Sequence, residues 1–78
     1  MEGKLGITYE AAVAEAVRKV RDPYARAYLL ALPQARAEYG EEGERAQLLY
    51  ALENMKEWRG RTASLCKAAM RKRAGTGR

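Results

Sequence analysis

The sequence contains no histidine and no phenylalanine, and it has a single cysteine, Cys66. Without histidine, the commonest general base and a principal zinc ligand are missing, so hydrolytic and zinc-dependent chemistry gain little support. A lone cysteine cannot form an internal disulfide, and it fits a reducing compartment. We therefore predict a cytoplasmic protein that is not an enzyme and that needs no cofactor or metal.

The chain also lacks long apolar segments. No stretch approaches the length that crosses a membrane, and the N-terminus, MEGKLGITYE, has no signal-peptide core. Its 78 residues predict one domain, 1–78, with 75–78 as a frayed basic tail. Small chains without disulfides often gain buried surface by pairing, so a homodimer is one expected state.

Apolar residues recur with the helical period, and no alternating strand pattern is present. We predict an all-α bundle of three to four helices over residues 8–21, 22–39, 42–59 and 62–74. Thr8 and Asp22 are expected as N-caps of the first two helices, and Thr62 as the cap of the last. The first three helices should meet in the core, with the fourth at its edge.

Pro33 falls inside the second predicted helix. Its ring clashes with the carbonyl of Leu29, but the apolar face continues across it, so we expect one helix, 22–39, that is kinked at Pro33. Gly40 should end that helix as a left-handed cap, and Gly60 should end the third helix.

Positive charge is concentrated at the C-terminal end. Residues 61–78 hold six basic residues and no acidic one, and they therefore supply more than the whole net charge of +5. A local excess of this kind indicates a polyanionic partner.

Two interpretations of this basic end are equally supported. It is either a solvated helix face that keeps the protein soluble, or a surface that contacts nucleic-acid phosphates. The residues that would make those contacts are Arg61, Lys67, Arg71, Lys72 and Arg73. A lipid-binding helix is less well supported, because the apolar side of this helix is small.

Two apolar side chains, Leu30 and Tyr50, fall on the predicted water-facing sides of their helices. They suggest a dimer interface or a docking surface for another protein, although packing against residues 1–7 would explain them equally well. Together with Glu41, Glu42 and Glu44 they form the predicted protein interface of the alternative function.

Residues 22–60 combine Asp-Pro-Tyr-Ala, Leu-Pro, Tyr-Gly-Glu-Glu-Gly, Gln-Leu-Leu-Tyr and Trp-Arg-Gly. This pattern resembles short uncharacterised helical proteins of phages, prophages and archaeal genomes. The resemblance implies a small accessory protein, with a viral origin as one implication. It carries no catalytic residue, and it does not cover the basic end.

The sequence thus predicts a small non-enzymatic protein whose basic C-terminal helix contacts DNA or RNA. The first alternative is a regulator or inhibitor that binds a host protein. The second is a self-assembling structural component.

Overall fold

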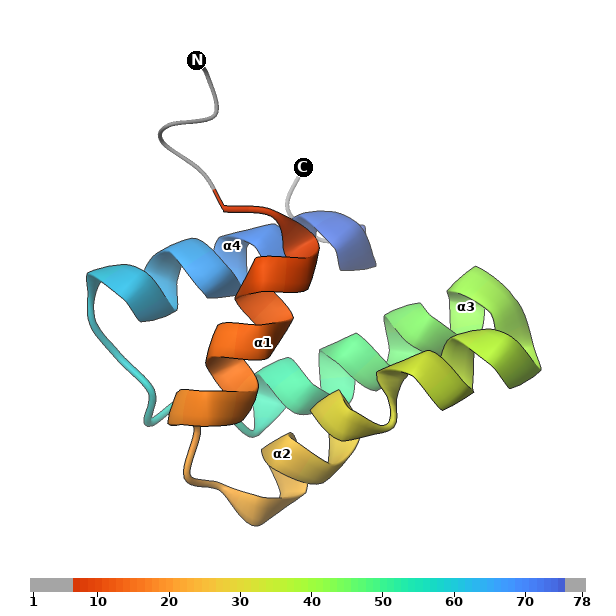
Figure 1. Ribbon diagram of the computed structural model, residues 1–78, viewed down its shortest axis with the longest axis horizontal. Coiled ribbons are helices and arrows are strands. Elements are labelled where there is room, and N and C mark those ends of the chain that lie inside the picture. Colours follow the sequence, from red (N-terminus) through yellow and green to blue (C-terminus); the bar gives the residue numbers. More distant parts are fainter. Residues whose placement is uncertain (1–6, 76–78) are drawn as a thin grey trace.

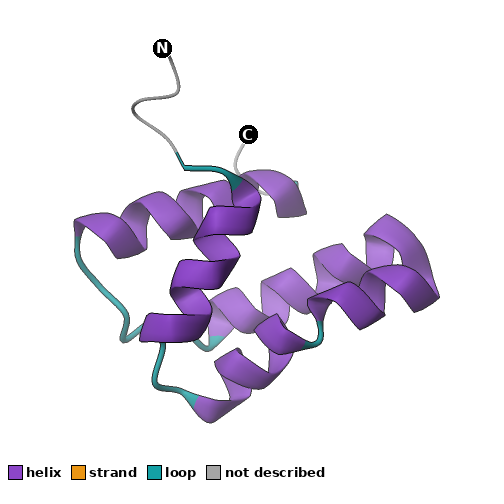
Figure 2. Ribbon diagram, viewed as in Figure 1, coloured by secondary structure: helices purple, strands orange, loops and turns teal. Residues whose placement is uncertain are grey.

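The computed structural model describes residues 7–75, and within that range the chain forms helices and no strand (Figures 1 and 2). The helices are α1 (Tyr9–Lys19), α2 (Pro23–Leu30), α3 (Leu32–Glu53) and α4 (Arg61–Ala74). The predicted all-α bundle is confirmed. Part of the predicted tail, residues 76–78, lies outside the described residues, as does most of the segment 1–7.

The predicted caps of α1 and α2 are present. The hydroxyl of Thr8 accepts a hydrogen bond from the Ala11 N–H at 3.1 Å, and Asp22 Oδ1 accepts from Tyr24 and Ala25 at 2.8 and 3.0 Å. Each cap satisfies N–H groups that have no acceptor inside the helix. At the other end of α1, the guanidinium group of Arg26 donates to the carbonyl groups of Val17 and Val20.

The helix is interrupted before Pro33, whereas we predicted one continuous helix that is kinked at this proline. α2 ends at Leu30, Ala31 has φ −88° and ψ −1°, and α3 begins at Leu32. Pro33 therefore lies in the first turn of α3, where its missing N–H costs no hydrogen bond. The interruption at Ala31 is what allows the proline to occupy that position.

α3 folds back on itself at Gly40, so that its residues 32–39 and 41–53 form two arms of a helical hairpin (Figure 1). The predicted break at Gly40 is confirmed, but its geometry is not the left-handed cap that we expected. With φ 75° and ψ −159°, Gly40 occupies a region that essentially only glycine adopts.

The third predicted helix, 42–59, is too long at its C-terminal end. The side-chain amide of Asn54 donates to the Tyr50 carbonyl at 2.9 Å and supplies one of the donors that the helix end lacks. The chain then leaves the helix, and Met55 enters the core with 1% exposure. Gly60, at φ 115°, is the N-cap of α4, which begins before the predicted cap Thr62.

The core draws on all four helices. Its buried members are Ala12, Ala16, Val20, Ala25, Leu29, Leu32, Leu48, Ala51, Met55, Cys66, Met70 and Ala74. α4 packs against both α1 and α3, and α2 packs against α3. Cys66 and Met70 of α4 are fully buried, so one side of α4 forms part of the core between α1 and α3, whereas we predicted that α4 would only pack at the edge of the core.

Candidate nucleic-acid interface

The buried side of α4 leaves the opposite side to solvent. Ala63, Cys66 and Met70 point into the core, and Arg61, Arg71 and Lys72 are exposed. α4 contains no acidic residue. Within residues 7–75, no hydrogen bond or ion pair engages the side chain of Arg61 or Lys72. We call Arg61, Arg71 and Lys72, with the small residues Ser64 and Ala68 between them, the outer face of α4.

Lys67, the fourth predicted contact, has an internal partner. Its ammonium group donates to the Trp58 carbonyl at 2.5 Å, and the side chain is only partly exposed. Burial lowers the pKa of Lys67, and the neighbouring charges of Arg71 and Arg59 lower it further. The side chain ties α4 to the preceding loop, so Lys67 lies at the margin of the outer face.

Arg73, the fifth predicted contact, is exposed but points toward α1 and α3. Its guanidinium carbon lies 4.5 Å from the centre of the Tyr9 ring, in cation–π geometry, and its Nε is 3.4 Å from Glu44 Oε1. The first turn of α1 and the last turns of α4 lie beside each other (Figure 1). Of the predicted set, Arg61, Arg71 and Lys72 are exposed on the side of α4 opposite the core, whereas Lys67 and Arg73 contact residues outside α4.

Glu44 is the only buried charged side chain within residues 7–75, with 6% exposure. Its carboxylate accepts hydrogen bonds from the Tyr9 hydroxyl at 3.0 Å, from Arg36 Nη1 at 2.8 Å and from Arg73 Nε at 3.4 Å. These donors come from α1, from the first arm of the α3 hairpin and from α4, so one carboxylate on the second arm joins three helices.

The environment shifts two pKa values in this cluster. Burial alone would raise the pKa of Glu44, but the hydrogen bonds from Tyr9 and Arg36 and the charge of Arg73 outweigh it, and the pKa lies below its usual value. Burial, and then the adjacent Glu44 carboxylate, raise the pKa of Tyr9. Glu44 is therefore ionised and Tyr9 protonated at neutral pH.

The residues of the predicted protein interface lie at separate places. Leu30 is 62% exposed and borders an apolar groove beside α1, and Tyr50 is 57% exposed with its ring 5.5 Å from that of Tyr28. Glu41 and Glu42 are exposed next to the Gly40 turn. Glu44, being buried, is not available to a protein partner.

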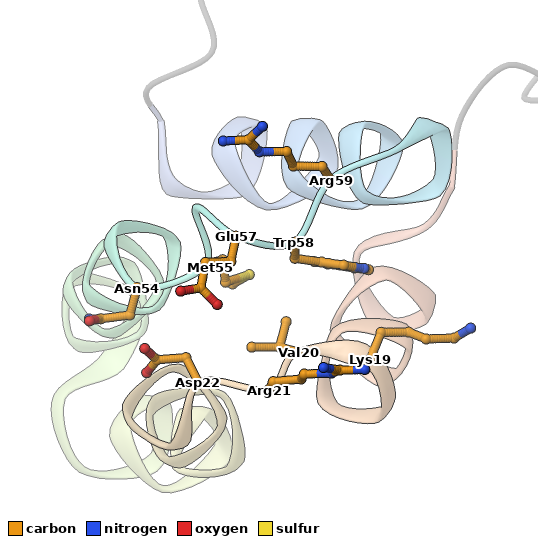
Figure 3. A pocket seen from close by; sticks show the side chains of 9 residues that line it. All are labelled: Lys19, Val20, Arg21, Asp22, Asn54, Met55, Glu57, Trp58 and Arg59. Carbon is orange, nitrogen blue, oxygen red and sulfur yellow. The ribbon is translucent and has the colours of Figure 1, made fainter.

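A second cavity, of about 290 Å³, lies between the α1–α2 turn and the loop before α4 (Figure 3). The ring of Trp58 lies across it from Val20 and Arg21, and charged residues of both signs surround it. Cys66, the single thiol, lies elsewhere in the core, where burial raises its pKa. A raised pKa keeps the thiol protonated and unreactive.

No protein-family model, curated protein or solved structure matches this chain. The resemblance of residues 22–60 to phage and archaeal proteins stays a prediction. Among the helices that the structure describes, none has both the length and the apolar character that a membrane crossing requires.

Proposed function

We propose that the protein binds nucleic acid in the cytoplasm through the outer face of α4. The observation that supports this proposal is the exposure of Arg61, Arg71 and Lys72 on a helix without an acidic residue. Phosphate groups are the natural partners of such cations, because each contact releases counterions from the nucleic acid.

The small side chains of the outer face suit a close approach to a phosphate backbone. Ser64 and Ala68 lie between the cations and keep the helix narrow. The face carries no Asn or Gln, the residues that pair with adenine edges, and arginine and lysine position a protein on phosphates as often as they read bases. We therefore expect binding that depends weakly on nucleotide sequence.

If the three cations contact duplex phosphates, the slope of log K against log salt should be about −3, at roughly 0.9 per contact. The double variant Arg61→Gln/Lys72→Gln removes two contacts and should reduce the slope to about −1. Fluorescence anisotropy of a labelled 20-base-pair duplex, titrated at several salt concentrations, measures both slopes.

The control is Arg18→Gln/Lys56→Gln, which lowers the net charge equally but changes exposed residues of α1 and the α3–α4 loop. It should keep a slope near −3, because neither residue belongs to the outer face of α4. Absence of binding near 100 mM salt, or equal slopes for the two double variants, would count against the proposal.

A second candidate function, a protein-binding regulator, is favoured by the exposed groove beside Leu30. Its lining includes Val13, Leu30 and Pro33, and Leu30 is 62% exposed. A bound protein would shield these apolar side chains from water. Affinity capture from nuclease-treated host lysate should then recover a stoichiometric protein with the wild type and lose it with Leu30→Asp. Recovery of the same protein by both chains would contradict this assignment.

A further inference from the structure

Three arginines surround an open polar cavity at the C-terminal end of α4. The cavity measures about 420 Å³, and we call it the arginine basin. Its lining residues are Arg36, Glu41, Glu44, Arg45 and Arg73. They come from both arms of the α3 hairpin and from the last turn of α4, and none of them belongs to the outer face of α4.

Glu44 holds two of the guanidinium groups without using up their donors. Only Nη1 of Arg36 and Nε of Arg73 bond to the carboxylate, and within residues 7–75 no other hydrogen bond engages these two groups. A guanidinium group has five N–H donors, so most of them stay available. The side chains are 46% and 40% exposed, so these donors can reach a ligand.

Arg73 is also fixed by its stacking over the Tyr9 ring at 4.5 Å. A guanidinium group that is already oriented loses less conformational freedom when a ligand binds. The buried carboxylate and the ring together therefore prepare the basin for a ligand, and the charge of Glu44 is offset by the two arginines that it orients.

Arg45 has the weakest internal partner of the three. Its Nη2 lies 3.9 Å from Glu41 Oε1, and the Glu41 side chain is 72% exposed. An exposed pair at this distance contributes only ~0–1 kcal/mol, so an incoming anion can displace the carboxylate.

We propose that the arginine basin binds a phosphate group. The cavity is lined by three guanidinium groups and two carboxylates; the Glu44 carboxylate is buried and already paired with Arg36 and Arg73, and the Glu41 carboxylate is exposed and displaceable. The planar fork of arginine matches the oxygen atoms of phosphate, and several converging forks select an anion with several oxygens over chloride. The site stands apart from the outer face of α4 and does not depend on duplex binding.

Titration of the full-length protein with inorganic phosphate, at constant ionic strength in chloride, tests the proposal. Saturable shifts of the arginine Nε–Hε signals should be observed by nuclear magnetic resonance. Arg45→Gln should weaken phosphate binding about tenfold, because it removes one charged donor set. Glu41→Gln should strengthen binding several-fold, because it removes the competing carboxylate.

Arg18→Gln, which removes an exposed arginine outside the basin, is the matched control and should leave the affinity unchanged. A nucleoside 5′-monophosphate, compared with the unphosphorylated nucleoside, shows whether the phosphate is free or carried. Tighter binding of the nucleotide than of inorganic phosphate indicates a carried phosphate group, and equal binding indicates a free one.

Non-saturating shifts, or equal phosphate affinities for Arg45→Gln and Arg18→Gln, would overturn the phosphate site. Neither result bears on the duplex titration, because that assay reports on Arg61 and Lys72. Conversely, the phosphate result stands if the protein binds no duplex.

Discussion

Gly43→Ala should destabilise the protein severely, although alanine in place of glycine normally stabilises a helix by about 1 kcal/mol. Gly43 lies on the second arm of the α3 hairpin, close to Ala35 and Tyr39 of the first arm. A Cβ atom at this position would lie 2.4 Å from Tyr39 Cβ and 2.9 Å from the Ala35 carbonyl oxygen. Both atoms belong to or adjoin the backbone, so no side-chain rotation relieves the contact.

The hairpin arms must move apart to admit the methyl group. Overpacking of this kind costs typically 1–3 kcal/mol and occasionally more, and a domain of this size has only ~3–5 kcal/mol in total. We therefore expect a loss of about 3 kcal/mol, enough to leave a large unfolded fraction at room temperature. Urea unfolding followed by circular dichroism measures the free energy of unfolding.

Ala46→Gly is the matched control, because it makes the reverse change at an exposed position of the same arm. It should cost only about 1 kcal/mol, the usual difference in helix propensity. A Gly43→Ala protein that is as stable as the wild type, or more so, would show that the arms do not cross at this point.

The contrast between Gly40 and Gly43 shows what the sequence could and could not predict. Gly40 follows the end of an apolar pattern, and that local signal correctly predicted a break in the helix. No sequence pattern around Gly43 predicts its role, because that role depends on contact with the other arm of the hairpin. The distance between two helical arms depends on tertiary packing, and the spacing of apolar residues along the sequence does not predict it.

The helix boundaries that depend on local hydrogen bonds were predicted correctly, and the one that depends on tertiary packing was not. Thr8 and Asp22 were predicted as caps because a cap is a local hydrogen bond. The early end of α3 at Glu53 was missed, because it depends on Met55 reaching a core that other helices complete. Tertiary packing there overrides a pattern that continues as helical to Trp58.

At the candidate interface, the sequence predicted a basic helix but not the direction of each side chain. Arg73 has its partners at Tyr9 and Glu44, which are far away along the chain, and no spacing rule connects them. Arg73, one of the predicted phosphate contacts, is therefore paired with Glu44 of α3. Arg61 and Lys72 have no such partner within residues 7–75, and on them the nucleic-acid proposal depends.

Glu44→Gln is the second substitution with a large expected effect. Glutamine preserves the shape of the side chain but removes the charge that Arg36 and Arg73 share, and its amide places a donor where the carboxylate accepts. Hydrogen bonds to charged groups contribute about 1.5–3 kcal/mol each, although the half-exposed arginines can regain water. We expect a net loss of about 2 kcal/mol at pH 7, measured by urea unfolding.

The dependence on pH distinguishes an ionic role of Glu44 from a steric one. Its pKa is lower in the folded state than in the unfolded chain, so its stabilising contribution is complete above the unfolded value, near 4.5. That contribution is lost as the pH falls through the folded pKa. The free energies of unfolding of the wild type and Glu44→Gln should therefore differ most at pH 7 and converge toward pH 3.

The control Glu53→Gln, which alters an exposed pair with Lys56, should change the free energy of unfolding by no more than about 0.5 kcal/mol. A difference between wild type and Glu44→Gln that is the same at pH 3 and pH 7 would show that the carboxylate charge does not hold the three helices together.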